Sequence, residues 1–119
     1  MTSTYPDLIR DLPEADLRLP GVRGWLLQGA TRQAVFFELP PGAAVPEHAH
    51  GAQWGIVISG ELELTIGGAL RTYRKGDTYE IPAGTPHSAA CPGGALVLDL
   101  FADPSRYGPR TPSPSQPPP

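Results

Sequence analysis

Glycine and proline divide this sequence into short pieces, and their spacing limits the possible fold more than any other feature. The chain has 14 Gly and 16 Pro among its 119 residues. Breakers recur at Pro40-Pro41-Gly42, at Gly67-Gly68 and at Lys75-Gly76-Asp77. Such residues mark turns and disfavour long helices, whereas short strands fit between them. The sequence therefore predicts an all-β chain of many short antiparallel strands.

The apolar segments between the breakers are the predicted strands. A first hairpin is expected to join 25–28 to 32–39 through a turn at 29–31. A strand pair bent at Gly60 is expected over 53–59 and 61–66. The other strands are expected at 43–50, 70–74, 78–81, 87–91 and 95–101. Periodicity alone leaves three architectures open, namely a jelly roll, an immunoglobulin-like sandwich and a barrel.

All three histidines fall in two glycine-flanked segments, His48 and His50 in 42–60 and His87 in 76–87. Residues i and i+2 of a strand point to the same face, so the imidazoles of His48 and His50 can converge on one point. Gln53 follows after a short gap, and a bend there would bring its amide oxygen to the same place. Imidazole and carbonyl donors suit divalent Zn, Fe, Mn, Ni or Cu without selecting one of them.

The first histidine segment resembles the first motif of the cupin family. That motif runs Gly, five residues, His-x-His, a short spacer, an acidic ligand and then Gly after six residues. The matching positions are Gly42, His48, His50, Gln53 and Gly60. A neutral amide at Gln53 replaces the carboxylate that cupins usually have.

The second segment is similar to the second cupin motif, which runs Gly, five residues, Pro-x-Gly, two residues, His, three residues, Asn. The matching positions are Gly76, Pro82, Gly84 and His87, and Cys91 stands where Asn is usual. The resemblance covers roughly 25–102 and implies a double-stranded β-helix, the cupin jelly-roll barrel. It also implies a metal site formed by His48, His50, Gln53 and His87.

Several residues near this site have more than one interpretation. Gln53 is either a fourth ligand through its amide oxygen or a residue that orients a ligand or a metal-bound water. Tyr79 and Glu80 alternate along a strand, so one of them faces the cavity, where Tyr79 could act as an acid, a base or a hydrogen-bond donor. Cys91 is expected to be a small buried side chain. The alternative for the three histidines and Gln53 together is that they line a polar cavity that holds no metal.

Two functions from different classes remain open at this point. The first is a metal-dependent enzyme that acts on a small molecule in the barrel cavity, of dioxygenase, isomerase or lyase type. The second is a binding or sensing module that captures a small ligand without changing it. Cupins include enzymes, sensors and storage proteins, so the resemblance alone does not separate the two.

Composition narrows the class of partner. The formal net charge is -3 and the isoelectric point is near 5.5, and no cluster of Lys and Arg indicates a nucleic-acid binder. The longest apolar runs, 34–37 and 54–58, are far shorter than the ~20 residues of a membrane span. The first residues do not resemble an export signal, and a single cysteine fits a reducing compartment. We therefore expect a cytoplasmic protein.

The two ends are expected to differ from the domain between them. Residues 1–24 carry prolines at 6, 13 and 20 and are predicted to form an extended arm. In 103–119, seven of 17 residues are proline, which predicts a disordered tail. Within the domain, Trp54, Ile56 and Ile58 make the predicted strand at 53–59 apolar on both faces. A second subunit covering the outer face is the expected reason, and a homodimer is predicted.

Overall fold

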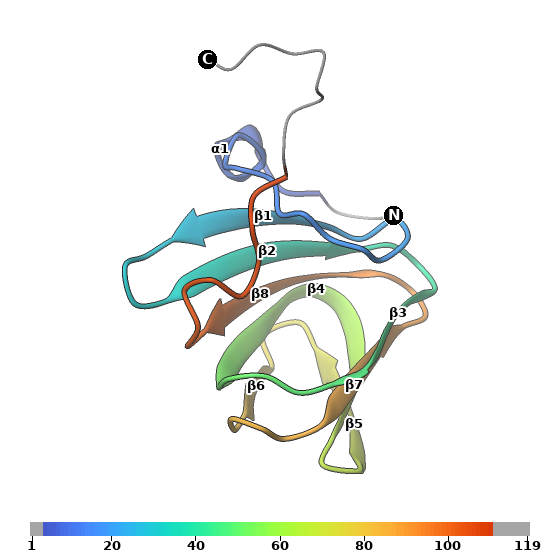
Figure 1. Ribbon diagram of the computed structural model, residues 1–119. Coiled ribbons are helices and arrows are strands. Elements are labelled where there is room, and N and C mark those ends of the chain that lie inside the picture. Colours follow the sequence, from blue (N-terminus) through green and yellow to red (C-terminus); the bar gives the residue numbers. More distant parts are fainter. Residues whose placement is uncertain (1–3, 111–119) are drawn as a thin grey trace.

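The structure is a computed structural model, and it describes residues 4–110 (Figure 1). The predicted all-β chain is confirmed, with one short helix near the N-terminus. The elements in chain order are α1 (Asp7–Arg10), β1 (Arg23–Gln28), β2 (Gln33–Leu39), β3 (Ala43–His48), β4 (Gln53–Ile66), β5 (Ala69–Arg74), β6 (Thr78–Ile81), β7 (His87–Cys91) and β8 (Ala95–Phe101). The strand boundaries lie close to those expected from the turn residues.

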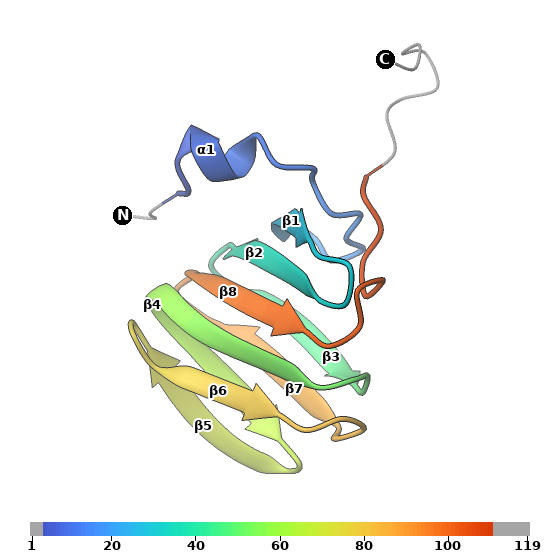
Figure 2. The same cartoon turned by 90° about the vertical axis from the view of Figure 1, so that its left-hand side faces the viewer.

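The strands form two antiparallel sheets that share β4. Its first part pairs with β8 and β6, and this sheet continues from β8 through β2 to β1. Its second part pairs with β5 and β7, and β7 pairs with β3. Figure 2 shows the first sheet in front of β3, β7 and the turned second half of β4. The shared strand curls the two sheets into a jelly-roll barrel, the architecture that the resemblance to cupins implies.

The bend in β4 lies at Gly60, as expected, but the strand is continuous over 14 residues rather than divided in two. Gly60 has φ 79°, a conformation that side chains disfavour, and a Cβ there would collide with the carbonyl oxygen of Gly94. The register against β8 also shifts between Val57 and Ser59. Such irregularities bend a strand, and here they pass it from one sheet to the other.

The apolar core fills the space between the sheets. Strand β2 shows the alternation that such a core requires, because every second residue from Gln33 to Leu39 is buried. The aromatic and aliphatic residues of this core include Val35, Phe37, Val57, Leu62, Leu64, Tyr73, Tyr79, Ile81, Val97 and Phe101. Cys91 belongs to the same core, as the sequence analysis expected.

The N-terminal arm is not extended throughout. The single-turn helix α1 begins after Pro6 and ends before Pro13, so the two prolines limit this helix without preventing it. Tyr5 is buried in a second cluster with Trp25 and Leu96, and its hydroxyl lies 3.0 Å from the carbonyl oxygens of Phe37 and Val97. The arm is therefore anchored on the first sheet.

No helix in the described part of the chain is long and apolar enough to span a membrane.

The segment after β8 also differs from expectation, because residues 103–110 pack on the barrel. Tyr107 contacts the core, and its backbone exchanges two hydrogen bonds of 2.8 and 3.0 Å with the side chain of Gln33. Pro109 forms a bridge with Ala15 of the arm. The proline content of 103–119 predicts a tail without packing, but the aromatic side chain of Tyr107 anchors the first part of this segment on the barrel. The rest of the predicted tail, 111–119, lies outside the described residues.

Candidate metal centre

The three histidines meet at one end of the cavity, although not quite as strand alternation predicts. His48 is the last residue of β3 and pairs with His87, the first residue of β7. His50 lies in the loop beyond β3, so the bend of this loop rather than a strand face brings its ring inward. The ring centroids are 4.3 Å apart for His48 and His87, 4.8 Å for His50 and His87, and 5.1 Å for His48 and His50.

Each imidazole is oriented by a hydrogen bond to a nearby backbone carbonyl. The Nδ1 atoms of His48, His50 and His87 lie 2.9, 2.8 and 2.9 Å from the carbonyl oxygens of Pro46, Gly51 and Thr85. Because a carbonyl can only accept, Nδ1 carries the proton and Nε2 has a free lone pair. Carbonyl partners of this kind fix the rings of metal-ligating histidines. The candidate donor atoms all lie within 4.8 Å of one another.

Three buried polar atoms at this place have no hydrogen-bond partner among residues 4–110, namely Nε2 of His50, Nε2 of His87 and Oε1 of Gln53. A buried acceptor without a partner is costly, so several together need an explanation. All three are acceptors, and a cation would satisfy them at once. The donor set therefore fits a divalent transition metal.

Burial also keeps the histidines in the form that binds metals. Desolvation lowers the pKa of His48 and of His50, and the nearby charge of Arg106 lowers both further. Hydrogen bonds to the carbonyls of Pro46 and Gly51 act in the opposite direction but do not outweigh burial. Both rings are consequently neutral at physiological pH, and neutral imidazole is the metal-binding form.

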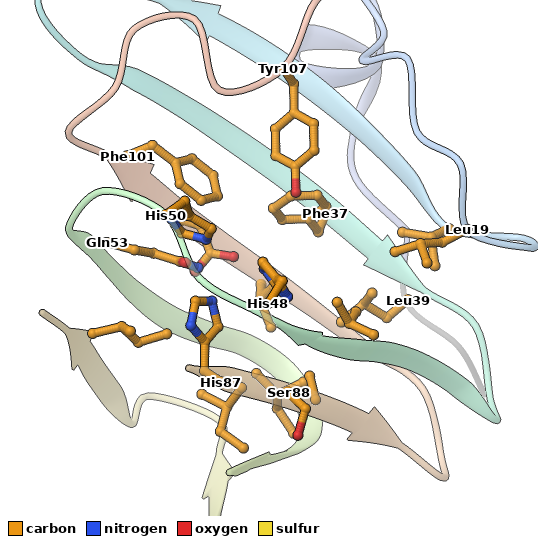
Figure 3. A pocket seen from close by; sticks show the side chains of 18 residues that line it. Leu19, Phe37, Leu39, His48, His50, Gln53, His87, Ser88, Phe101 and Tyr107 are labelled. Atoms are coloured by element: carbon orange, nitrogen blue, oxygen red, sulfur yellow. The ribbon is translucent and has the colours of Figure 1, made fainter. Parts of the chain in front are cut away.

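Gln53 lies beside the histidines, as the sequence analysis predicts. It is the first residue of β4, with Phe101 of β8 on one side and Ile81 of β6 on the other. Figure 3 shows its side chain reaching the same space as His48, His50 and His87. This position suits either role foreseen for Gln53, a fourth ligand or a residue that orients one.

An acidic residue that the sequence analysis missed lies next to this group. Asp99 of β8 is buried, lines the cavity, and accepts a hydrogen bond of 2.5 Å from the Tyr79 hydroxyl. Gly55 makes this contact possible, because a Cβ at Gly55 would overlap both side chains. Burial raises the pKa of Asp99 to about 6, although hydrogen bonds from Tyr79 and Gln53 lower it. The one sequence signal was an acidic residue within the apolar run of β8.

The neighbours Tyr79 and Glu80 follow the predicted alternation. Tyr79 is buried and Glu80 is exposed. Tyr79 therefore faces inward, but its hydroxyl is engaged by Asp99 and lies behind the cavity lining rather than in it. Its role is to hold Asp99 in place.

The cavity above the histidines has apolar walls and a small polar floor. It is partly open to solvent. Phe37 and Phe101 form the walls, with Leu19 and Tyr107 from outside the barrel strands (Figure 3). Tyr107 packs edge to face on Phe37 and on Phe101. A partly open cavity with apolar walls and few polar groups at one end suits a small organic molecule.

A curled double sheet with three converging imidazoles in its cavity defines a small β-barrel protein with a metal-type donor cluster. The sequence pattern of the cupin domain family matches residues 35–101, which is more than half of the chain. The chain belongs to the cupin family. No curated protein sequence matches it.

Solved structures agree with this assignment. An RmlC-like cupin from Shewanella frigidimarina is 28% identical, with a TM-score of 0.72 over 81% of this chain and 87% of that chain. KdgF from Halomonas sp. is 28% identical, with a TM-score of 0.67 over 73% and 83% of the two chains. A Bacillus subtilis oxalate decarboxylase studied for its Mn(II) centres is 28% identical, with a TM-score of 0.68 over 76% of this chain and 27% of that chain.

Proposed function

We propose that this protein is a metal-dependent enzyme that binds one divalent transition metal through His48, His50, His87 and Gln53 and acts on a small molecule in the barrel cavity. The observation that carries the proposal is the convergence of buried acceptor atoms without partners on one point. A bound ion of this kind polarises an oxygen atom of the ligand. Mn²⁺ is one candidate, since a similar cupin fold contains Mn(II).

Asp99 favours an enzyme over a binding module. Its carboxyl lines the same cavity, and its pKa of about 6 lets it both hold and release a proton near neutral pH. Tyr79 donates to one carboxylate oxygen and fixes its orientation. A buried group with a shifted pKa beside a metal-type cluster is typical of acid–base sites. We therefore propose proton transfer to or from the ligand as the reaction class, as in isomerases and lyases.

Metal analysis tests the first part of this proposal. Chelator-treated protein is mixed in turn with Mn²⁺, Fe²⁺, Ni²⁺, Cu²⁺ and Zn²⁺, desalted and analysed. We expect one ion per chain, lost in His87→Ala because the site then lacks one of its donors. Ser88→Ala is the matched control, since Ser88 lines the cavity without belonging to the histidine cluster. Failure of the wild-type chain to retain any of these ions would refute the metal site.

Isotope exchange tests the second part. Metal-loaded protein is incubated in D₂O with a panel of small carbonyl and hydroxy compounds, and exchange at carbon is followed by NMR. We expect exchange in the wild-type protein and its loss in Asp99→Asn at unchanged metal content. If metal and ligand bind but no compound exchanges or reacts, including in oxygen-uptake assays, the protein is a binding or sensing cupin.

We also propose a homodimer formed through the outer face of the first sheet. Trp54 and Leu100 are paired across β4 and β8 and are 40% and 41% exposed, and Ile58 lies further along β4 on the same side. A second copy of the chain suits this exposed apolar patch, because a two-fold contact sets the same patch of the two copies together. The reduced, buried Cys91 supports a cytoplasmic location as a further part of the proposal.

A further inference from the structure

Tyr107 is a firmly placed part of the cavity wall, although it lies outside the barrel strands. Its backbone N–H donates to Oε1 of Gln33 at 3.0 Å, and its carbonyl oxygen accepts from Nε2 of the same side chain at 2.8 Å. Gln33 is only 1% exposed, and its Nε2 also donates to Oε1 of Gln28 at 2.9 Å. A buried glutamine bonded in this way fixes the backbone of Tyr107.

The ring of Tyr107 is held on several sides as well. Its centroid is 5.9 Å from that of Phe37 and 5.6 Å from that of Phe101, and both contacts are edge to face. The guanidinium carbon of Arg106, which does not line the cavity, is 4.3 Å from the same centroid. Figure 3 shows the hydroxyl end of Tyr107 directed into the cavity, toward the side on which the histidines lie. The position of the hydroxyl oxygen is therefore set before a ligand binds.

This hydroxyl is not used within the described chain. The hydrogen bonds between Tyr107 and Gln33 involve only the tyrosine backbone, and no residue among 4–110 is bonded to the hydroxyl. Tyrosine hydroxyls that are removed from water usually have a partner, because an unused polar group loses its hydration without compensation. Burial raises the pKa of Tyr107, against the opposing charge of Arg106. The hydroxyl is consequently protonated at neutral pH and can donate a hydrogen bond.

Tyr107 brings a polar group to a wall that Phe37 and Phe101 make aromatic. The Phe101 ring connects this wall with the metal site, because its centroid is 5.6 Å from the His50 ring and 5.6 Å from the Tyr107 ring. A molecule with a few carbon atoms that lies along Phe101 can therefore reach both. A polar group in an apolar wall discriminates between ligands, because a ligand without a matching oxygen leaves it unpaired.

We propose that Tyr107 is a ligand-binding residue whose hydroxyl donates to an oxygen atom at the end of the ligand remote from the metal. The cavity then selects small molecules that carry two oxygen functions separated by a short carbon chain, over analogues with an oxygen only at the metal. The proposal rests on the metal site of the proposed function and names the class of ligand.

Hydroxamates of different length test this role, because their oxygens bind a divalent ion and leave the other end of the molecule to reach the wall. The hydroxamates of acetic, propionic and butyric acid are titrated by calorimetry into protein loaded with the ion that it retains. Each is compared with its analogue that carries a terminal hydroxyl group. We expect this group to strengthen binding by about threefold to tenfold at one chain length or more, the range of one neutral hydrogen bond.

Tyr107→Phe should abolish the preference for the hydroxylated compounds and leave the affinity for their parents unchanged. The substitution keeps the ring and its edge-to-face contacts, so a purely structural role of Tyr107 would leave the preference in place. Tyr73→Phe is the matched control and should keep the preference, since Tyr73 is buried in the core and does not line the cavity.

The outcomes separate this proposal from the metal site. With normal metal content, a preference that survives in Tyr107→Phe, or no preference at any length in the wild-type chain, refutes the role of Tyr107. If no ion is retained, the titrations are repeated on the metal-free chain. A preference that depends on Tyr107 there refutes the metal and keeps the hydroxyl contact, whereas no binding refutes both.

Discussion

Strands β4 and β8 carry polar side chains on the inner face and large apolar side chains on the outer face, at neighbouring positions of the chain. On the inner face, Gln53 and Asp99 point into the barrel, and Asp99 is only 5% exposed. On the outer face, their chain neighbours Trp54 and Leu100 are 40% and 41% exposed. At these positions polar side chains lie inside, beside the apolar core, and large apolar side chains lie outside, the reverse of the usual arrangement.

Side chains still alternate regularly between the two faces, and the difference lies in what each face contacts. Side chains alternate with a period of two, so each face can be optimised without the other. Buried polar groups and exposed apolar surface both destabilise an isolated chain. In the function proposed above, a metal and its ligand stabilise the inner face, and a second subunit covers the outer face. Substitutions on each face can test that division.

The largest effect is expected from Gly55→Ala on the inner face. Its Cβ would overlap the Asp99 carboxylate and the Tyr79 ring, both fixed in the core. Overpacking of this kind destabilises a fold by about 3 kcal/mol, and the melting temperature should fall by more than about 10 °C. Thermal unfolding followed by circular dichroism measures it. Gly51→Ala is the matched control, because a Cβ there meets nothing within 4 Å. Equal melting temperatures would show that the inner face is not tightly packed.

Asp99→Asn is expected to change how stability depends on pH. The folded pKa of Asp99 is raised to about 6 from 3.8. Between these values the folded chain holds a proton that the unfolded chain releases, so stability falls as pH rises through this window. The asparagine variant lacks this loss. Relative to that of the wild-type chain, its free energy of unfolding should rise by on the order of 3 kcal/mol between about pH 4 and pH 7.

Urea unfolding of chelator-treated protein is the appropriate measurement, since metal release in acid would otherwise obscure the trend. Asp11→Asn serves as the control because Asp11 is exposed. If the free energy of unfolding depends on pH in the same way for Asp99→Asn and the wild-type chain, Asp99 does not hold a proton in the folded protein.

On the outer face, Trp54→Asp should convert the proposed dimer to a monomer. An aromatic residue at the centre of an interface contributes about 2 kcal/mol or more, and a new charge adds a desolvation cost. Light scattering should show twice the chain mass of 12.6 kDa for the wild-type protein and that mass itself for the variant. Leu70→Asp, on the exposed β5 hairpin of the other sheet, should leave the dimer intact. A monomeric wild-type chain would reject the second subunit as the partner of this face.

The smallest effect concerns Gln53→Glu. If Gln53 is a ligand, a carboxylate at nearly the same length should strengthen metal binding by about 1 kcal/mol or more, and Gln53→Ala should weaken it by less. Calorimetric titration above and below about pH 6.5 is needed, because protonation of the histidines competes with the metal. The lowered pKa values of His48 and His50 confine that competition to the acidic side. Unchanged affinity in Gln53→Glu would leave a three-histidine site.

Much of this molecule follows from local sequence patterns. Turn residues place the strands, and the histidine pair with its distant third member indicates the cavity. Asp99 could not be found in this way, because its partner Tyr79 is 20 residues away and the contact depends on the absence of a Cβ at Gly55. The position of Tyr107 was missed for a related reason, since Gln33, which it bonds, is 74 residues away. Contacts of this range arise from topology, which no local pattern records.

Tyr107 and Leu19 close the cavity from segments that belong to no barrel strand. Connecting segments accept substitutions, insertions and exchanges more readily than strands do. His48 and His87 are held instead by paired strands and by hydrogen bonds to backbone carbonyls. Ligand preference can therefore diverge between relatives, or be re-engineered in the laboratory, by replacing these two segments while the histidine cluster at the other end of the cavity stays the same.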